Sequence, residues 1–474
     1  MSQRDHWGSR LGFVLAAAGS AVGLGNLWKF PYIAWNNDGG AFVYVYLVCI
    51  AVIGLPLMMA EIMIGRRAQT SPVPAYGQLG FPKWAFVGWI GVAAGVIILA
   101  FYVVIAGWSI SSFYNCLRWS FSGYHNDVDF GAFVGSGSTQ ISLSLVFLFI
   151  TAIIVSRGVS KGIEKATKIM MPVLFAILLY LVINSGFLDG FGKAFTFLLR
   201  PNFGEFFAHP HGILEALGHA FFTLSLGMGA MVTYGSYMSK GESITRSAIA
   251  IVVLDTVIAL TACVIMYSII FSVPELQERL RGGGMSTSSM LFVTLPEMFY
   301  TKVPGGVFVG PIFYILVGFA ALTSTISLLE VVTALLVDKL NIPRTKATFS
   351  AAGGIGVLTI GAALSLGASE FLTNMKLFGP LEWLNHKITA DKAGVLAILD
   401  HVSANWFLPV GGFLFAIFVG WVFKKKDAVE ELELQNADGS PSFWFNAWYF
   451  AVKVICPLVI GYIIFKVLKG ADFS

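Results

Sequence analysis

The sequence predicts an all-α integral membrane protein, on the evidence of its composition, the length of its apolar runs and the position of its basic residues. Hydrophobic residues make up 57% of the chain and charged residues 12%, whereas roughly a quarter of an ordinary soluble domain is charged. Apolar runs of about 20 residues, enough to cross the hydrocarbon core of a bilayer, recur along the chain. We expect about eleven transmembrane helices, at about 11–35, 41–65, 84–117, 140–156, 164–186, 213–238, 243–272, 306–337, 347–367, 403–423 and 443–467.

The basic residues of the short loops predict the orientation of these helices. Every second loop carries them, in the order Arg4 and Arg10; Arg66, Arg67 and Lys83; Arg157, Lys161, Lys165 and Lys168; Lys240 and Arg246; Lys339, Arg344 and Lys346; and Lys424 to Lys426. By the positive-inside rule these loops are cytoplasmic, which places the N-terminus inside. We therefore expect a multi-pass protein of the inner (plasma) membrane, in which the net charge of +4 reflects topology and not affinity for nucleic acid.

Two of the expected spans contain a Gly-x-Gly near their middle, where a helix is expected to break. These segments are residues 20–26 in the first span and residues 225–229 in the sixth. Gly19 and Gly23 also form a GxxxG pattern, which by itself favours close helix packing, but the pairing of the two breaks favours unwound segments. Because five spans separate the breaks, an inverted five-plus-five repeat is expected, with a binding site where the breaks meet.

Polar side chains near the two breaks predict a cation site: Asn26, Thr223, Ser225, Asp255, Thr323 and Ser324. A serine or threonine in a span usually bonds back to its own helix. A mid-span carboxylate such as Asp255, however, costs roughly 2.5–3.5 kcal/mol to insert and is a functional candidate by default. These groups offer only oxygen ligands, which hard cations prefer. Sodium is therefore the expected coupling ion, with protons as the alternative.

Several long motifs stand in one order along the chain: Trp7-Gly-Ser-Arg-Leu-Gly12, Gly19-Ser-Ala-Val-Gly-Leu-Gly-Asn-Leu-Trp-Lys-Phe-Pro31, Gly39-Gly-Ala-Phe42, Gly54-Leu-Pro56, Glu61, Arg157-Gly-Val-Ser-Lys-Gly-Ile-Glu164, Phe221-Phe-Thr-Leu-Ser-Leu-Gly-Met-Gly229 and Ala320-Ala-Leu-Thr-Ser324. Together they resemble the bacterial amino-acid branch of the neurotransmitter:sodium symporter family. The resemblance implies a LeuT-type inverted five-plus-five repeat with helices 1 and 6 broken. It also implies one transmembrane transporter domain, 1–474, with repeats at about 9–186 and 213–423 and a final helix at about 443–467.

The activity implied by the resemblance is sodium-coupled symport of a neutral, hydrophobic or aromatic L-amino acid by alternating access. Two sodium (Na+) sites are implied. One combines a backbone carbonyl with three side chains, and the substrate's own carboxylate completes it: Ala21, Asn26, Thr223 and Asp255. The other combines three carbonyls with two hydroxyls: Gly19, Val22, Ala320, Thr323 and Ser324. A ligand shared by ion and substrate couples their binding reciprocally.

The resemblance also implies a substrate site. The substrate's carboxylate would be received by the N–H groups of Leu24 and Gly25 and by the hydroxyl of Tyr102, and its ammonium would face carbonyls near Ala21 and Phe222, with Ser225 close by. An apolar pocket, adaptable through its methionine, would be lined by Ile98, Phe222, Met228, Ser324 and Leu328. Gly23 stands where amine-transporting relatives carry an acid, which favours an amino acid over a monoamine as substrate.

Two gates are implied by the same resemblance. The outer one pairs Lys29 with Asp400 above Tyr102 and Phe222, and the inner one pairs Arg4 with Asp338, supported by Trp7 and Tyr237. Lys29 replaces the arginine of most relatives, so bidentate pairing with a carboxylate is lost.

Two further positions depart from the family pattern. His219 replaces a glutamine. Ala259 stands one turn after Asp255, where chloride-dependent members carry a chloride-binding serine. We expect Asp255 to supply the compensating negative charge, so that chloride is not required.

Two other function classes stay open from the sequence alone: a sodium-dependent amino-acid sensor on the same fold, and an ion channel. A channel needs a continuous polar pore, whereas the polar side chains cluster at one level of the membrane. A sensor would bind the same ligands without moving them. An enzyme is not expected, because no GxSxG, HExxH or phosphate-binding glycine loop stands beside a usable acid or base. The long loop expected at 371–399 has no assigned role.

Overall fold

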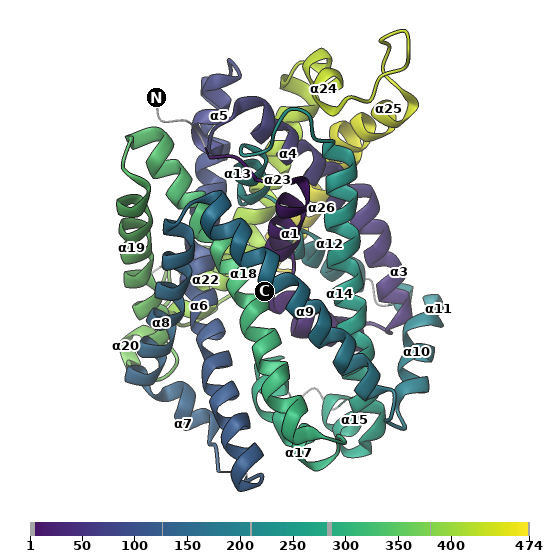
Figure 1. Ribbon diagram of the computed structural model, residues 1–474, viewed down its shortest axis with the longest axis vertical. Coiled ribbons are helices and arrows are strands. Elements are labelled where there is room, and N and C mark those ends of the chain that lie inside the picture. The colour runs from purple at the N-terminus through teal and green to yellow at the C-terminus, as the bar shows by residue number, and fades with distance from the viewer. Residues whose placement is uncertain (1–4, 126, 209–210, 282–286, 380, 473–474) are drawn as a thin grey trace.

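The computed structural model describes residues 5–125, 127–208, 211–281, 287–379 and 381–472. Within these residues the regular elements are all helical, and a single isolated bridge joins Gln435 to Pro441. In the described part of the chain, nine segments are long and apolar enough to cross a bilayer (Figure 1): Gly40–Ala68, Pro82–Ser122, Gly137–Ser156, Val159–Ser185, Ile244–Ser272, Gly306–Leu340, Arg344–Leu364, Val395–Val422 and Phe443–Leu468. The all-α prediction is confirmed, and the first and sixth expected spans are absent from the nine because each is interrupted in its middle.

Most of the nine segments are successions of α-helices and short turns of π-helix or 3-10 helix, labelled η. In chain order their elements are α3 (Gly40–Cys49), η2 (Ile50–Gly54), α4 (Leu55–Ala68), η3 (Pro82–Trp84), α6 (Ala85–Ser122), α8 (Gly137–Ser156), η4 (Val159–Glu164), α9 (Lys165–Ser185), α14 (Ile244–Ser272), α18 (Gly306–Leu340), α19 (Arg344–Leu364), α22 (Val395–Val402), η6 (Ser403–Phe407), α23 (Leu408–Ile417), η7 (Phe418–Val422), α25 (Phe443–Phe450), η8 (Ala451–Ile455) and α26 (Cys456–Leu468). The elements between spans are α5 (Pro72–Gln78), α7 (Phe130–Gly135), α10 (Phe191–Leu199), α11 (Phe203–Ala208), α15 (Pro274–Arg281), α16 (Thr287–Ser289), η5 (Met290–Thr294), α17 (Leu295–Thr301), α20 (Glu370–Thr373), α21 (Glu382–Thr389) and α24 (Lys425–Leu432).

Proline explains many of the π-helical turns. Five of them directly precede an α-helix with proline in its first turn: Pro31, Pro56, Pro296, Pro409 and Pro457. Proline has no N–H to donate to the carbonyl one turn earlier and its ring clashes there. A widened turn relieves that clash without ending the helix, as π-bulges do elsewhere.

The first expected span breaks between α1 (Arg10–Ala21) and the turn η1 (Gly25–Lys29), which leads into α2 (Phe30–Asn36). Val22 has an extended backbone, with φ −72° and ψ 109°. Asn26 supplies partners for the freed backbone: its Oδ1 accepts from the Gly23 N–H over 3.1 Å, and its own N–H donates to the Gly23 carbonyl over 3.2 Å. Lipid could not satisfy these groups, so the backbone and side chain of Asn26 help to stabilise the predicted break.

The sixth expected span breaks between α12 (His211–Thr223) and α13 (Ala230–Gly235). Three residues of the break have left-handed backbones, with φ of 54° at Ser225, 77° at Gly227 and 74° at Gly229, and glycine adopts this conformation at little cost. Glu61 on α4 accepts a hydrogen bond from the Gly227 N–H over 2.8 Å. A buried carboxylate thus holds the second predicted break in place.

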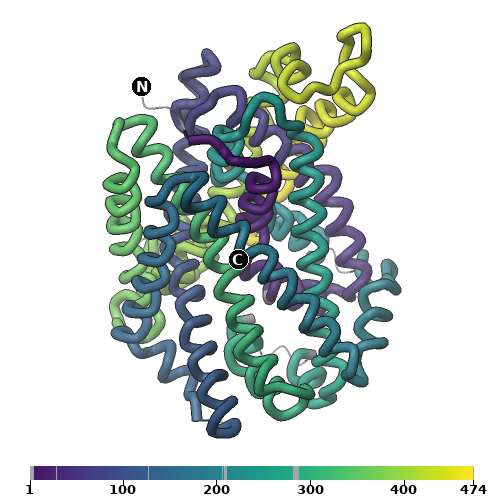
Figure 2. Tube along the Cα trace, in the orientation of Figure 1, coloured from purple at the N-terminus to yellow at the C-terminus, as the bar shows by residue number. Residues whose placement is uncertain are grey.

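The two breaks lie side by side at the centre of the molecule. Figures 1 and 2 show the purple α1 among longer helices, where it contacts α9, α14 and α18. The Ser225 hydroxyl donates to the Ser20 carbonyl over 2.9 Å, which joins one break to the other. The prediction that they meet is confirmed.

Ion pairs at one end of the bundle, the end that carries α24 in Figure 1, join α24 to the last turn of α4. Arg66 Nε lies 2.6 Å from Glu431 Oε1, and Arg67 lies 3.1 Å from Asp427. The elements α7, α15 and α17 lie at the opposite end (Figure 1). The positions of Arg66 and Arg67 agree with the alternation of basic loops in the sequence.

The predicted extent of the loop at 371–399 is wrong. Most of α20 and all of α21 lie within it, and α22 begins at Val395 instead of near residue 403. Two polar residues, Asp400 and His401, hid the start of this helix in the sequence. His401 is nevertheless only 1% exposed, because Asp472 from a distant part of the chain provides a hydrogen-bond partner.

Candidate functional site

A central cavity of about 30 Å³ lies between the two breaks. Its walls are Ser20, Ala21, Gly23, Gly25, Asn26, Ile98, Tyr102, Phe222, Thr223, Ser225, Met228, Ser324, Ser327 and Leu328. All the predicted substrate residues except Leu24 are among them. The Leu24 N–H donates to the Tyr102 hydroxyl over 2.9 Å, so this residue joins the group through its backbone. A cavity of this size holds about one water molecule, so the central cavity is contracted in this conformation.

The predicted residues of the first cation group converge on one carboxylate oxygen, Asp255 Oδ1. Asn26 Nδ2 donates to it over 2.8 Å and the Thr223 hydroxyl over 3.0 Å. The Thr223 hydroxyl also lies 3.2 Å from Asn26 Oδ1. All three side chains are at most 2% exposed, and Ala21 lies beside Asn26 and Thr223 in the wall of the central cavity. Three oxygen-bearing side chains from three helices therefore meet at the first break.

The predicted residues of the second group also lie together, between α1 and α18. The Ser324 hydroxyl lies 3.3 Å from the Val22 carbonyl and 3.3 Å from that of Ala320. The Thr323 hydroxyl lies 3.0 Å from the Ala320 carbonyl and 3.5 Å from that of Val22. A Cβ on Gly19 would lie only 3.1 Å from Thr323 Cβ, so the absence of a side chain brings the two helices together here.

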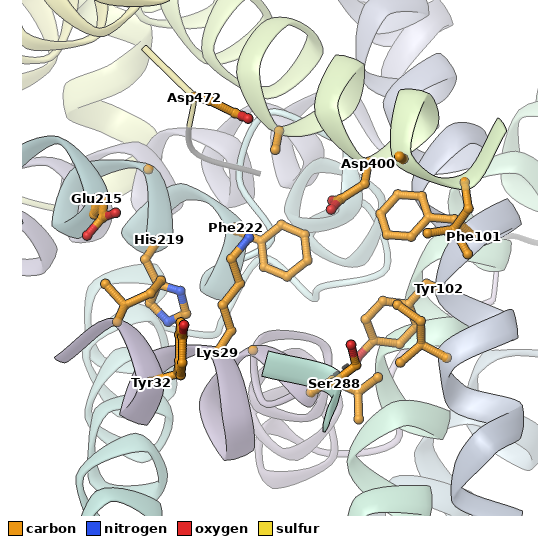
Figure 3. A pocket seen from close by; sticks show the side chains of 18 of the residues that line it. Lys29, Tyr32, Phe101, Tyr102, Glu215, His219, Phe222, Ser288, Asp400 and Asp472 are labelled. Carbon is orange, nitrogen blue, oxygen red and sulfur yellow. Dashed lines mark hydrogen bonds between the residues drawn. The ribbon is translucent and has the colours of Figure 1, made fainter. Parts of the chain in front are cut away.

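A large cavity of about 450 Å³ lies beyond the central one (Figure 3). Tyr102 and Phe222 line both cavities and separate them. The residues predicted for the outer gate face this space: Lys29 Nζ lies 5.7 Å from the centre of the Phe222 ring, and Asp400 lines the same cavity. His219 lines it too, and neither of its ring nitrogens has a hydrogen-bond partner in the part of the chain that is described.

The opposite side of the central cavity is closed around Trp7, which is 5% exposed. Its indole N–H donates to the Tyr234 carbonyl over 2.9 Å, and its backbone N–H donates to the Tyr237 carbonyl over 3.2 Å. The Tyr237 hydroxyl donates to Glu330 over 2.6 Å, and Arg344 pairs with the same carboxylate. Trp7 and Tyr237 therefore lie together, as predicted.

The ion pair predicted for the inner gate is not tested, because Arg4 lies outside the described residues. Asp338 accepts hydrogen bonds from the Ser71 N–H over 2.7 Å and from the Thr70 hydroxyl over 3.1 Å. These bonds tie the last turns of α18 to the segment between α4 and α5.

Sequence comparison places this architecture in a known family. The profile described as the Sodium:neurotransmitter symporter family matches residues 4–130 and 131–472, which is nearly the whole chain. This chain belongs to the sodium:neurotransmitter symporter family. As a member of that family it is a sodium-dependent transporter, and not an enzyme.

Individual members of the family show how close the likeness is. The chain is 36% identical over 462 residues to the uncharacterized sodium-dependent transporter YhdH of Bacillus subtilis, covering 96% of this chain and 95% of YhdH. It is 30% identical over 475 residues to an uncharacterized sodium-dependent transporter of Haemophilus influenzae, covering 97% of both chains. The crystal structure of MhsT in complex with L-phenylalanine superposes with a TM-score of 0.81 at 36% identity, covering 98% of this chain and 100% of MhsT.

Sequence reasoning assigned no individual role to four residues that line or support the site of this symporter family member. Ser20 and Ser327 line the central cavity, and their hydroxyls lie 2.7 Å apart. Ser327 stands three residues after Ser324, on the same helix face, and this spacing could have revealed it. The Tyr46 hydroxyl lies 3.5 Å from Asp255 Oδ2, and Glu61 holds the second break. Nothing in the sequence connects these two residues with the distant segments that they contact.

Proposed function

We propose that this protein couples the inward movement of sodium to the uptake of a neutral L-amino acid with an apolar or aromatic side chain, and that it does so by alternating access. One observation carries the proposal. The oxygens of Asn26, Thr223 and Asp255 gather at an unwound segment that also borders an apolar pocket. A cation and an amino acid would therefore bind next to each other.

The two ends of the central cavity suit the two parts of an amino acid. At the first break, the backbone N–H of Leu24 donates to the hydroxyl oxygen of Tyr102. The hydroxyl can still donate its own hydrogen to a carboxylate, and the N–H can donate to one once that bond opens. The rest of the wall is largely apolar, with Ile98, Phe222, Met228 and Leu328. MhsT, which is bound to L-phenylalanine in its crystal structure, supports an apolar or aromatic side chain.

The charge balance of the wall favours a neutral substrate. The ionisable side chains of the central cavity wall are limited to the tyrosine Tyr102, among the residues that are described. A cationic or anionic side chain would therefore be buried there without a charged partner, which is costly. A neutral side chain avoids this cost.

The two oxygen groups are proposed to bind one sodium ion each, as cargo. In the first, Asn26, Thr223 and Asp255 would be joined by the Ala21 carbonyl and by the substrate's carboxylate. In the second, the carbonyls of Gly19, Val22 and Ala320 would act with the hydroxyls of Thr323 and Ser324. A carboxylate shared with the first ion strengthens the binding of both ligands by the same factor, which is the basis of coupling.

Asp255 is proposed to make chloride unnecessary. Its carboxylate lies within the first group, and Ala259, one turn later on α14, is fully buried and offers no hydroxyl to an anion. The negative charge that balances the cation would therefore come from the side chain of Asp255 and not from a bound anion.

The end of the molecule that carries α24 is proposed to face the cytoplasm of a cell whose inner membrane holds the protein, because its loops are basic. With this orientation, the large cavity opens to the outside and Trp7 closes the inside. Two inverted repeats, at about 9–186 and 213–423, would then rock against each other so that the closed end opens when the large cavity closes.

Equilibrium binding tests this proposal. Purified protein would be incubated with radiolabelled leucine, phenylalanine, tryptophan, glutamate or lysine, in sodium or in potassium. We expect binding of the neutral apolar and aromatic amino acids in sodium only. Binding that is equal in potassium, or a preference for glutamate or lysine, would overturn the assignment.

A further inference from the structure

The loop between α19 and α22 is locally folded, although the function described so far gives it no role. Asn385 on α21 is 2% exposed. Its side-chain oxygen accepts from the Thr389 hydroxyl over 2.9 Å, and its Nδ2 donates to Asp391 Oδ1 over 3.2 Å. His386 Nδ1 lies 2.8 Å from the other oxygen of Asp391. The loop is therefore a small, internally bonded unit.

This unit is fastened to the helix that follows it. The indole N–H of Trp406, in η6, donates to the Ile388 carbonyl over 2.8 Å. The Gly394 N–H donates to the Met375 carbonyl over 3.0 Å, and the Leu396 N–H to the Ser365 hydroxyl over 3.0 Å. The loop is thus hydrogen-bonded both to the start of α22 and to η6, which follows α22 in the chain.

A second segment, residues 469–472 after α26, reaches the same place. Asp472 Oδ2 lies 2.9 Å from the Lys392 ammonium. Asp472 Oδ1 lies 3.0 Å from His401 Nδ1 and accepts from Asn405 Nδ2 over 3.0 Å. One carboxylate therefore joins the loop to two successive turns of the α22–η6 segment.

The buried partners of Asp472 make this contact specific. His401 is 1% exposed and Asn405 is fully buried. A carboxylate only accepts hydrogen bonds, so His401 Nδ1 carries the proton that it donates. Without Asp472 these two buried side chains would lose a charged hydrogen-bond acceptor, which is costly.

Asp472 also lies at the large cavity. Asp472, Lys392 and Asp400 all line it, and Figure 3 shows Asp472 and Asp400 on the same side of that space. His401 directly follows Asp400, and the π-helical η6 begins two residues later. Such turns often mark places where a helix adjusts. Asp472 therefore holds the part of α22 that carries the predicted gate carboxylate, next to a π-helical turn.

We propose that residues 469–472 and the loop residues 365–379 and 381–394 form a strap that fixes α22, with Asp472 as a positioning residue that keeps Asp400 at the large cavity, which Lys29 also lines. The role of Asp400 as a gate rests on the proposed function. The role of the strap in fixing α22 does not rest on the proposed function, because it concerns only the position of this helix.

Distances between spin labels test the strap. Labels would be attached at Ala397→Cys on α22 and at Tyr114→Cys on α6, because the four native cysteines are buried. In sodium without any amino acid, we expect one narrow distance distribution. Asp472→Asn should broaden it about twofold or add a second population, because α22 then samples more than one position.

Two further variants complete the test. Glu382→Gln removes the same charge from an exposed position of α21 and should leave the distribution unchanged. Lys392→Gln removes only the partly exposed ion pair with Asp472. It should broaden the distance distribution less than Asp472→Asn does. If Asp472→Asn does not fold, Lys392→Gln decides alone.

A narrow, unshifted distribution in Asp472→Asn and Lys392→Gln would overturn the proposal, as would equal broadening in Glu382→Gln. A merely structural role of Asp472 would lower the thermal unfolding temperature and leave the distance distribution as it was. The distance measurement contains no amino acid and therefore does not depend on transport. If the wild-type protein did not transport amino acids, the proposed function would be disproved, but the distances that test the strap would be unaffected.

Discussion

The Thr223 hydroxyl donates a hydrogen bond to Asp255 Oδ1 over 3.0 Å, between the end of one half of a broken helix and the middle of α14. Asn26, from the other broken span, donates to the same oxygen over 2.8 Å. The buried carboxylate of Asp255 is thus hydrogen-bonded to a residue from each of the two broken spans. A cation placed there would replace the hydrogen bonds that these three side chains make with one another.

Removing the charge of Asp255 should weaken sodium binding. Asp255→Asn keeps an oxygen ligand but removes the negative charge opposite the cation, so it should raise the sodium concentration for half-maximal amino-acid binding by about tenfold or more, which corresponds to about 1.4 kcal/mol. Titration of sodium in an equilibrium binding assay measures this. Asp129→Asn, which changes an exposed cap of α7, is the control and should titrate like the wild type. Equal sodium titrations for Asp255→Asn and the wild type would argue against the first sodium group.

Replacing chloride with gluconate should leave uptake unchanged. The carboxylate of Asp255 provides the fixed negative charge, and buried Ala259 has no hydroxyl to bind an anion. The measurement is initial uptake in sodium chloride and in sodium gluconate at equal sodium concentration. Uptake that disappears in gluconate would show that an anion, and not Asp255, balances the cation.

Gly23→Ala should abolish most substrate binding, whereas Gly25→Ala should be tolerated. A Cβ on Gly23 would lie 2.7 Å from the Ser324 hydroxyl oxygen and 2.8 Å from that of Tyr102, so it would displace groups proposed to hold the substrate. A Cβ on Gly25 would make ordinary contacts of 3.5 Å with Phe222. Overpacking costs about 1–3 kcal/mol, which corresponds to a loss of affinity of about 5- to 150-fold in the first variant. Similar affinities in both variants would contradict this arrangement.

Glu431→Gln should destabilise the protein more than Glu430→Gln. The side chains of Arg66 and Glu431 are 3% and 11% exposed and lie 2.6 Å apart, whereas that of Glu430 is 68% exposed. Breaking a buried pair costs about 3–5 kcal/mol, and an exposed pair contributes about 0–1 kcal/mol. Thermal unfolding in detergent compares the two variants. Equal unfolding temperatures would show that α24 is not held by this pair.

The sequence predicted the parts of the fold that follow from local chemistry. Two Gly-x-Gly segments within apolar spans indicated where helices 1 and 6 break, because glycine tolerates left-handed backbones such as those at Gly227 and Gly229. The carboxylate of Asp255 indicated a polar centre, because a charge in a span needs a partner. The grouping of Asn26, Thr223 and Asp255 came from the family resemblance, and the distances between these side chains agree with it.

Contacts between distant segments could not be predicted. Asp472 lies 71 residues from His401 in sequence, and nothing near either residue indicates the other. The early start of α22 was missed for the same reason, because a buried polar side chain such as His401 needs hydrogen-bond partners, and Asp472, one of them, is far away in sequence. The contracted central cavity also depends on side-chain packing that no sequence pattern contains.

Uptake into proteoliposomes is the measurement that tests the central claim most directly. Vesicles that contain the purified protein would receive a labelled neutral apolar amino acid, such as phenylalanine, with an inward sodium gradient or with equal sodium on both sides. We predict accumulation above the external concentration only while the gradient lasts, because coupling makes the sodium gradient drive the amino acid. Sodium-dependent binding without accumulation would contradict symport and identify a sensor, and a sodium current without the amino acid would identify a channel.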